Sequence, residues 1–339
     1  MHILHALFTP VLGGLEQSYI NTTEALVSEG HKVTQLLRAD APYRAAAAKH
    51  ARALPLTPLG FYDVFAAFRV RRLLKQIKPD IIVAHNARAI TLLSFAAQGL
   101  GVPVVGVSHS YKTARAMRAD VLVVLSEHMK KHFLAAGYKG RIEVIPNLIR
   151  LPQKPVARPR RRPPVIGAIG RLSPEKGFDV LLKALGEIRQ RGIAFKAVAA
   201  GDGEESAKLK SLAGELGIGA NVEWPGWIED KTRFYNRIDI LCIPSRQDSF
   251  PMVVLEALAH GVPIVATNAP GPAAMLTHGV DGIIVPRDDA PALAEALATL
   301  VTQPALAAQL AENGWQTVQR YDFAATARKW GGVLIALKK

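Results

Sequence analysis

The sequence has very little cysteine: Cys242 is its only thiol. One cysteine can form neither an intramolecular disulfide nor a thiolate metal cluster, so small disulfide-stapled proteins are excluded and a cytoplasmic location is expected. Long hydrophobic runs are also lacking. One long stretch without Lys, Arg, Asp or Glu covers residues 89–111, but Gly99, Gly101 and Pro103 divide it into a helix, a turn and a strand. We therefore expect no membrane-spanning segment.

Several sequence signals of other protein classes are absent. The first residues carry no basic region and are interrupted at Pro10, so we expect no signal peptide. No Asp-x-Asp pair occurs, and no group of His, Cys, Asp or Glu has metal-ligand spacing, so we expect neither a metal nor another cofactor. The G-x-G-x-x-G fingerprint is missing as well, which disfavours a nicotinamide-dependent oxidoreductase.

The length of 339 residues exceeds what one hydrophobic core usually organises and favours two domains. Runs rich in Val, Ile and Leu alternate with segments of helical spacing on both sides of a proline- and arginine-rich stretch. This pattern predicts the α/β class, with two Rossmann-like, doubly wound domains facing each other across a cleft. The expected parts are an N-terminal domain over 1–150, a linker over 151–164, a C-terminal domain over 165–322 and a last helix over 323–339 that packs back toward the first domain.

The expected strands are short. They cover 3–8, 32–37, 80–84, 102–107, 120–125 and 141–145 in the first domain, and 165–169, 195–200, 221–224, 240–243, 263–266 and 283–285 in the second.

Positive charge is concentrated in the first half of the chain. The net charge is +14, and residues 1–155 contribute 20 Lys and Arg against 9 Asp and Glu, or +11. Such asymmetry favours a polyanionic partner, either a nucleic acid or an anionic membrane. The alternative is that the charge serves only to keep the protein soluble. A nucleic-acid binder is disfavoured because no recognition helix or aromatic-studded basic strand is present.

One predicted helix, over 61–77, combines apolar and basic residues. Its apolar side would hold Phe61, Val64, Phe65, Phe68 and Leu73, with Arg69, Arg71, Arg72 and Lys75 around it. Such a helix can dock on an anionic membrane, but more often it packs on its own sheet through the apolar side.

The first candidate site is the turn Gly13-Gly14, between the first strand and a helix that opens at Leu15. Glycines let the backbone approach a phosphate or sugar closely, and a helix N-terminus offers unpaired N–H groups. A plain turn is an equally good reading of two adjacent glycines.

The second candidate is the loop GRLSPEKG, residues 170–177, directly after the first strand of the second domain. Arg171 and Lys176 on one loop can bracket a diphosphate and neutralise a departing nucleotide. A solvated surface loop is the alternative.

The third candidate is DSFPMVVLEALAHG, residues 248–261. Asp248 precedes a helix that begins near Met252, and Glu256 falls one turn inside it, so the two carboxylates can accept from sugar and ribose hydroxyls. The backbone N–H groups of Phe250 to Val254 would point into the site from the helix start.

These motifs together resemble the retaining glycosyltransferases of family 4, the glycosyl transferases group 1, which have the glycosyltransferase-B fold. The resemblance covers nearly the whole chain. It rests on GGLEQ, His109 after a strand, ADVLVVLSEHMKKHF, VIPN, GRLSPEKGFDVLLKAL, AAGDGEE, PGW, DILCIPSRQDSFPMVVLEALAHGVPIVAT and DGIIVP, in that order.

The resemblance implies roles for individual residues. It assigns Arg171 and Lys176 to the donor diphosphate, Glu256 to the ribose and Gly14 of the Gly13-Gly14 turn to the distal phosphate. His109 is assigned to the sugar near the reacting carbon. Asp248 and the backbone of Phe250, Pro251, Met252 and Val253 are assigned to the donor sugar and phosphate.

The resemblance also implies a reaction. It would be a metal-free, retaining transfer of a hexose-type sugar from a nucleotide-diphosphate sugar, by front-face attack, to a lipid, lipopolysaccharide or other glycan acceptor. The basic first domain favours peripheral contact with the inner face of the cytoplasmic membrane. A nucleotide-sugar epimerase on the same fold is the alternative enzyme.

Two positions depart from the family pattern. Asp248 stands where the family usually has Glu, which shortens the reach to the sugar by one methylene. Leu148 follows the Pro-Asn pair where Gly is usual, so a local backbone change is expected there. His85, after a strand of the first domain, is either an acceptor contact or a hydrogen-bonded structural residue.

Overall fold

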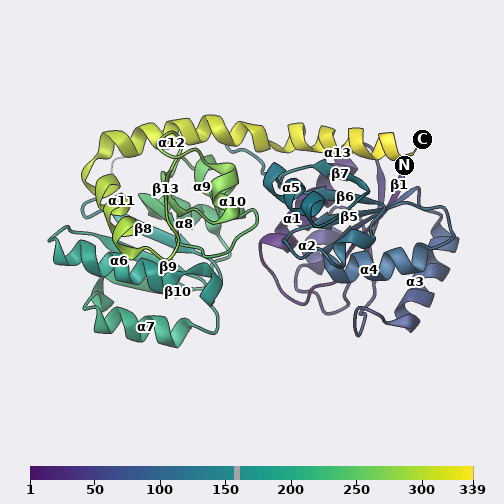
Figure 1. The fold of residues 1–339 in the computed structure, drawn as a ribbon, viewed down its shortest axis with the longest axis horizontal. Helices are drawn as coiled ribbons and strands as arrows, with labels where there is room; N and C mark the ends of the chain where they lie inside the picture. The colour runs from purple at the N-terminus through teal and green to yellow at the C-terminus, as the bar shows by residue number, and fades with distance from the viewer. Residues whose placement is uncertain (156–160, 339) are drawn as a thin grey trace. The chain divides into compact units, whose positions relative to one another are not determined.

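The computed structural model describes residues 1–155 and 161–338 (Figure 1). The middle of the predicted linker, including Arg158 and Arg160, lies outside the described residues. The chain forms two compact units. Unit 1 contains Met1–Arg150 and Tyr321–Lys339, and unit 2 contains Leu151–Arg320.

Unit 1 is built on a seven-stranded parallel sheet in the order β3-β2-β1-β4-β5-β6-β7. Its strands are β1 His2–Leu7, β2 Lys32–Leu37, β3 Arg52–Pro55, β4 Ile81–His85, β5 Val104–Ser108, β6 Val121–Val124 and β7 Arg141–Val144. Its helices are α1 Gly14–Ser28, α2 Arg44–Ala48, α3 Val64–Ile77, α4 Asn86–Ala97, α5 Glu127–Ala135 and α13 Phe323–Leu337, with a 3-10 turn at Ala116–Arg118.

Unit 2 is built on a six-stranded parallel sheet in the order β10-β9-β8-β11-β12-β13. Its strands are β8 Val165–Ile169, β9 Lys196–Ala200, β10 Val222–Gly226, β11 Ile240–Ile243, β12 Ile264–Thr267 and β13 Ile283–Val285. Its helices are α6 Phe178–Gln190, α7 Ser206–Glu215, α8 Lys231–Arg237, α9 Met252–Ala259, α10 Pro270–Met275, α11 Ala290–Thr302 and α12 Pro304–Val318, with 3-10 turns at Pro174–Lys176 and Gly219–Asn221. A further 3-10 turn, Gln319–Tyr321, includes the last two residues of unit 2 and the first residue of the C-terminal segment of unit 1.

The predicted α/β class with two Rossmann-like, doubly wound domains is confirmed. Each expected strand appears within one or two residues of its predicted position, because buried parallel strands read as continuous Val, Ile and Leu runs. The edge strand β3 and the helices α2 and α10 were not predicted. The strand β3 contains Arg52 and Pro55, which carry no apolar pattern, and α10 contains two prolines.

The C-terminal helix α13 belongs to unit 1, where it packs beside α1. Trp330 and Leu334 of α13 join a buried cluster that contains Ile3 of β1 and Leu26 of α1. Leu148 is buried in a smaller cluster with Ala25, Phe323 and Ala327. The leucine after the Pro-Asn pair therefore anchors the start of α13 against α1.

Within the described residues, no helix has both the length and the hydrophobicity needed to cross a bilayer.

Candidate functional site

The carboxyl ends of β8 and β11 carry two of the predicted motifs. These strands are neighbours in the unit 2 sheet, so the loops that follow them, residues 170–177 and 244–251, leave the same edge. The loops are in direct contact, because the N–H of Arg246 donates to the carbonyl of Glu175 at 2.8 Å. Gly177 has φ +66°, and a Cβ there would lie 2.1 Å from the carbonyl oxygen of Pro244. Only glycine permits this approach.

Lys176 and Asp248 meet where these loops touch. Lys176 Nζ donates to Asp248 Oδ2 at 2.6 Å, although 72 residues separate them in sequence. Both side chains are largely shielded from solvent, whereas Arg171 on the same loop is exposed. The structure thus joins a cation from the second sequence motif to a carboxylate from the third.

Glu256 is buried in α9 and is held by two residues of α8. Lys231 Nζ donates to Oε1 at 2.6 Å, and the Tyr235 hydroxyl donates to Oε2 at 2.8 Å. Burial and the nearby negative charge of Glu256 raise the pKa of Tyr235 well above its usual value, so Tyr235 acts as a hydrogen-bond donor. Neither Lys231 nor Tyr235 was predicted, although their i, i+4 spacing places them on one helix face.

The start of α9 corrects one expectation. The expectation is that backbone N–H groups from Phe250 to Val254 point into the site. Pro251 is the N-cap residue and has no N–H, and the N–H of Val254 donates to the carbonyl of Pro251 at 3.1 Å. Met252 and Val253, the first two residues of the helix, carry backbone N–H groups at positions whose donors an α-helix does not use.

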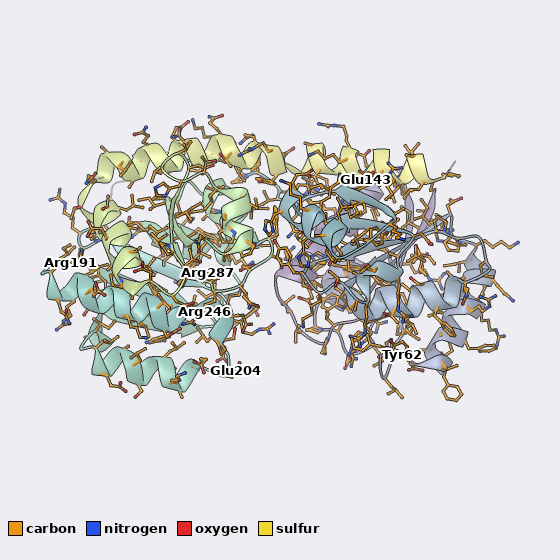
Figure 2. All side chains as sticks on the ribbon, in the orientation of Figure 1. Tyr62, Glu143, Arg191, Glu204, Arg246 and Arg287 are labelled. Atoms are coloured by element: carbon orange, nitrogen blue, oxygen red, sulfur yellow. The ribbon has the colours of Figure 1, made fainter. Side chains whose placement is uncertain are left out.

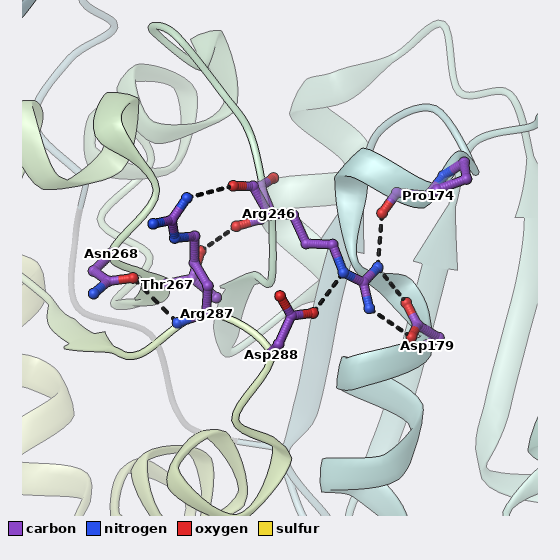
Figure 3. Close-up of polar contacts among 8 residues, drawn as sticks. Pro174, Asp179, Arg246, Thr267, Asn268, Arg287 and Asp288 are labelled. Carbon is purple, nitrogen blue, oxygen red and sulfur yellow. Dashed lines mark hydrogen bonds and ion pairs between the residues drawn. The ribbon is translucent and has the colours of Figure 1, made fainter.

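Arg246 ties the two loops to a third segment of unit 2 (Figure 3). Its guanidinium donates to both carboxylate oxygens of Asp179 at 2.8 Å, to the carbonyl of Pro174 at 2.7 Å and to Asp288 at 2.5 Å. Burial opposes ionisation of Asp179, but the bidentate contact with Arg246 lowers the pKa of that carboxyl below its usual value. Arg246 was not predicted, and it fixes the loop that carries Lys176.

The Gly13-Gly14 turn lies in unit 1, where Gly13 is the N-cap residue of α1. The helix begins at Gly14, one residue earlier than expected. Glu16 in its first turn is buried, and its Oε2 would lie 3.3 Å from a Cβ placed on Gly13. A side chain at Gly13 would therefore press against this carboxylate.

His109 follows β5 in unit 1 and contacts His85, the last residue of the neighbouring strand β4. His85 Nδ1 and His109 Nε2 are 2.9 Å apart, and the two rings stack with centroids 5.1 Å apart. His85 in turn packs edge-on against His5 of β1, which stacks on Tyr19 of α1. His85 is fully buried, which agrees with a hydrogen-bonded structural role.

Burial sets the protonation of this histidine row. It lowers the pKa of His109 to about 4 and that of His5 to about 3, and the pKa of His85 lies well below its usual value for the same reason. All three rings are therefore neutral near pH 7. His5 was not predicted as part of a site, and its place beside His85 follows from the pairing of β1 with β4.

Across residues 1–155 and 161–338, the structure contains no group of three or more His, Cys, Asp or Glu residues placed to hold a metal ion.

The two parallel sheets define an α/β protein with two Rossmann-like units. Sequence comparisons identify its family. The model described as Glycosyltransferase Family 4 matches residues 12–153, and the model described as Glycosyl transferases group 1 matches residues 151–317. The chain belongs to this family of glycosyltransferases and is a glycosyltransferase enzyme.

Two relatives from Rhizobium meliloti (strain 1021) match over most of their length. The lipopolysaccharide core biosynthesis glycosyltransferase LpsD is 28% identical over 94% of this chain and 93% of that protein. The corresponding values for the lipopolysaccharide core biosynthesis glycosyltransferase LpsE are 26%, 90% and 91%.

Solved structures share the fold. Anabaena Alr3699/HepE, determined in complex with UDP, superimposes with a TM-score of 0.86 at 22% identity, covering 99% of this chain and all of that chain. The sucrose-phosphate synthase of Thermosynechococcus elongatus gives a TM-score of 0.87 at 21% identity, covering 99% of this chain and 98% of that chain. The glycosyltransferase-B fold is therefore shown.

Proposed function

We propose that this glycosyltransferase is retaining and metal-independent, and that it moves a hexose-type sugar from a nucleotide-diphosphate sugar to a lipid-linked, lipopolysaccharide or other glycan acceptor. The observation that carries the proposal is the pair of shielded carboxylates after β11, each held by a lysine: Asp248 by Lys176 and Glu256 by Lys231. The similarity to LpsD and LpsE, two lipopolysaccharide core biosynthesis glycosyltransferases, supports a lipopolysaccharide acceptor, and UDP in the HepE structure supports a nucleotide donor.

The Lys176–Asp248 ion pair is suited to exchange partners when a donor binds. The donor diphosphate carries more negative charge than one carboxylate, so it attracts Lys176 and the exposed Arg171. Asp248 then loses part of its ion pair and can accept a hydrogen bond from a sugar hydroxyl. In this scheme the diphosphate is neutralised by side-chain cations, and no metal is needed.

Glu256 is suited to bind the ribose. Each carboxylate oxygen can accept two hydrogen bonds, and Lys231 and Tyr235 use one at each oxygen. The remaining lone pairs can accept from the two ribose hydroxyls. Lys231 and Tyr235 therefore fix the orientation of the carboxylate before the donor arrives, which lowers the entropic cost of binding.

The reaction we propose is a front-face substitution. The bond between the anomeric carbon and the leaving phosphate oxygen breaks, and a bond from the acceptor oxygen to that carbon forms on the same face. The acceptor proton moves to the leaving phosphate oxygen, and the nucleoside diphosphate departs. Arg171 and Lys176 stabilise the charge that develops on the diphosphate.

Unit 1 contains the residues that the family resemblance assigns to the sugar and the distal phosphate. His109, neutral near pH 7, can exchange a hydrogen bond with a sugar hydroxyl, and its contact with His85 orients the ring. The turn at Gly13 and Gly14 offers backbone N–H groups at the start of α1.

The proposal is tested by product analysis. The protein is incubated with UDP-glucose, UDP-galactose or GDP-mannose and a deacylated lipopolysaccharide core saccharide, with EDTA present, and the new glycosidic linkage is read by proton NMR. We expect the anomeric configuration of the donor to be kept and turnover to survive EDTA. An inverted linkage would contradict retention, and activity lost in EDTA and restored by Mg²⁺ would contradict metal independence. Conversion of the donor sugar without acceptor would identify an epimerase.

A further inference from the structure

Unit 1 exposes an apolar surface at the start of α3, the helix that Figure 1 shows beside α4. Leu59, Phe65 and Phe68 are 93%, 87% and 69% exposed. Tyr62 and Val64 are exposed beside them in the sequence, and Tyr62 is labelled near the edge of unit 1 in Figure 2. We call these five residues the α3 patch. Large exposed apolar side chains gathered in one segment indicate a binding surface more often than single scattered ones do.

The α3 patch is exposed because the helix packs through its other side. The buried residues of α3 are Ala66, Ala67, Val70 and Leu74, and they face α4. We expected α3 to pack through the side that contains Phe65 and Phe68, and this expectation was wrong because both side chains are exposed. Small alanines let the two helices approach closely, so the larger aromatic rings are left outside.

Positive charge surrounds the α3 patch. Arg69, Arg72 and Lys75 are exposed on α3, while Asp63 is the only acidic residue among residues 57–78. The Asp63 carboxylate accepts the backbone N–H groups of Leu59 and Ala66, so part of its charge is offset by the helix start.

Two further arginines approach the patch from the segment between β5 and β6. The guanidinium carbon of Arg115 lies 3.8 Å from the centroid of the Phe61 ring, and that of Arg118 lies 5.6 Å from the centroid of the Tyr62 ring. Both distances are in the range of cation–π contacts. Arg115 and Arg118 are both exposed, so their charges remain available to a partner.

The positive charge around the α3 patch indicates which kind of partner it binds. A second copy of the chain would bring two arginine-rich surfaces together in a symmetric dimer, and like charges oppose that contact. A nucleic acid would meet the charge and could stack on the aromatic rings, but it would leave the exposed aliphatic side chains of Leu59 and Val64 without an apolar contact. An anionic bilayer satisfies both features, because its headgroups attract the cations while the acyl boundary accepts aliphatic and aromatic side chains.

We infer that the α3 patch and its surrounding arginines dock the protein on the surface of an anionic membrane. Phe65, Phe68 and Leu59 insert at the acyl boundary, and Arg69, Arg72, Arg115 and Arg118 contact lipid phosphates. Arg71 is not part of this surface, since its guanidinium donates to the carbonyls of Ala96 and Gln98 at 3.0 and 2.7 Å and joins α3 to α4. The inference rests on the proposed function, because docking is useful to the enzyme if its acceptor is carried by a membrane lipid.

The test measures binding of the full chain to vesicles of phosphatidylcholine with and without phosphatidylglycerol, in the absence of donor and acceptor. We expect co-sedimentation with the anionic vesicles alone, and release as salt rises. Arg69→Gln with Arg72→Gln should lower the partition coefficient about thirtyfold, because each of the two cations contributes about 1 kcal/mol near the surface. Phe65→Ser with Phe68→Ser should lower it at least as much.

Matched control variants are available in the same unit. Lys131→Gln with Lys139→Gln removes the same charge from exposed positions outside the patch, and Leu134→Ser with Ile335→Ser removes exposed apolar side chains. Both controls should bind vesicles as the unchanged protein does. As a second readout, Phe65→Trp should gain fluorescence that brominated phosphatidylglycerol quenches, which does not depend on the serine variant folding.

Three results would overturn the inference: no binding by the unchanged protein, equal binding by both patch variants, or an unquenched tryptophan at position 65. Dimerisation that Phe65→Ser with Phe68→Ser abolishes would instead identify the patch as a contact between copies. The proposed function is tested separately by thermal stabilisation with UDP-glucose, UDP-galactose and GDP-mannose, which the patch variants should leave unchanged. If no nucleotide-sugar raised the unfolding temperature of either the unchanged protein or the patch variants, that result would count against the proposed function alone.

Discussion

Lys176 Nζ and Asp248 Oδ2 lie 2.6 Å apart at the point where the loops after β8 and β11 touch. This contact joins the cation that is expected to bind the donor diphosphate to the carboxylate that is expected to bind the donor sugar. Because the sheet places these loops side by side, the ion pair holds both groups at one edge of unit 2 before any donor arrives. The arrangement leads to testable consequences.

The first prediction concerns the charge of Lys176. Lys176→Ala removes a cation whose contact with the diphosphate strengthens as the nucleotide leaves, so transition-state stabilisation should fall by about 2–4 kcal/mol, and the same holds for Arg171→Ala. The measurement is kcat/KM for sugar transfer. Lys208→Ala, which removes an exposed lysine paired with Glu205, is the matched control and should change little. Near-normal kcat/KM in both Lys176→Ala and Arg171→Ala would refute the diphosphate assignment.

The second prediction separates Asp248 from Lys176. Asp248→Ala should impair transfer and change the preference among donor sugars, because the carboxylate that grips the sugar hydroxyl is lost. In a double-mutant cycle, the two substitutions should cost less together than the sum of their separate costs, since each already breaks the same ion pair. Additive effects and an unchanged sugar preference would show that Asp248 has no part in sugar binding.

The third prediction concerns donor affinity at Glu256. Glu256→Gln leaves one acceptor oxygen and removes the charge partner of Lys231, so the dissociation constant for the donor should rise with a smaller effect on kcat. Tyr235→Phe removes the hydroxyl that holds Oε2 and should weaken donor binding by about 1 kcal/mol. Calorimetric titration measures both, with Glu295→Gln, an exposed carboxylate paired with Arg191, as the control. Unchanged affinity in Glu256→Gln would rule out ribose binding by this residue.

The fourth prediction concerns Arg246, which Figure 3 shows between Asp179 and Asp288. Arg246→Lys cannot make the bidentate contact with Asp179 and reach Asp288 and the carbonyl of Pro174 together, so the free energy of unfolding should fall by about 1–2 kcal/mol. Urea unfolding measures this change, and Arg191→Lys, an exposed arginine labelled in Figure 2, should leave stability nearly the same. Equal stability of both variants would show that the Arg246 contacts do not hold the loops.

The fifth prediction concerns pH. Burial lowers the pKa of His5 to about 3 and of His109 to about 4, whereas both rings titrate near 6.5 in the unfolded chain. Below pH 6.5 the unfolded state therefore binds more protons than the native state, and the free energy of unfolding should fall as pH is lowered from 6.5 toward 4. Urea unfolding at pH 7.5 and 5.5 measures the slope. His5→Gln should make the slope shallower. A slope that His5→Gln leaves unchanged would contradict the burial effect.

Much of the fold could be predicted because parallel strands covered on both faces need continuous apolar runs, as in β4, β5 and β8. The strand β3 was not predicted because an edge strand can contain Arg52 and Pro55 and so lacks a continuous apolar run. The side through which α3 packs was predicted wrongly, because the helical spacing of Phe65 and Phe68 is typical of a buried helix face. Only the tertiary structure shows that α4 accepts Ala66 and Val70 instead.

The candidate site could be predicted in part. Lys176, Asp248 and Glu256 stand in motifs whose residue types and spacing indicate their chemistry. Lys231, Tyr235 and Arg246 could not be assigned, because their partners lie 21 to 72 residues away in the sequence. The pairing of β8 with β11 and the tertiary contact between α8 and Glu256 of α9 bring these partners close. These residues hold the charged groups in place, and spacing along the sequence does not predict such tertiary contacts.

The most direct test of the central claim is calorimetric titration of the protein with UDP-glucose, UDP-galactose and GDP-mannose in the presence of EDTA. The account predicts that at least one nucleotide-diphosphate sugar binds with one-to-one stoichiometry, that Lys176→Ala and Glu256→Gln each weaken this binding, and that Lys208→Ala does not. Binding that is absent for every donor, or equal in the unchanged protein and both site variants, would contradict the assignment of the donor site to the loops after β8 and β11.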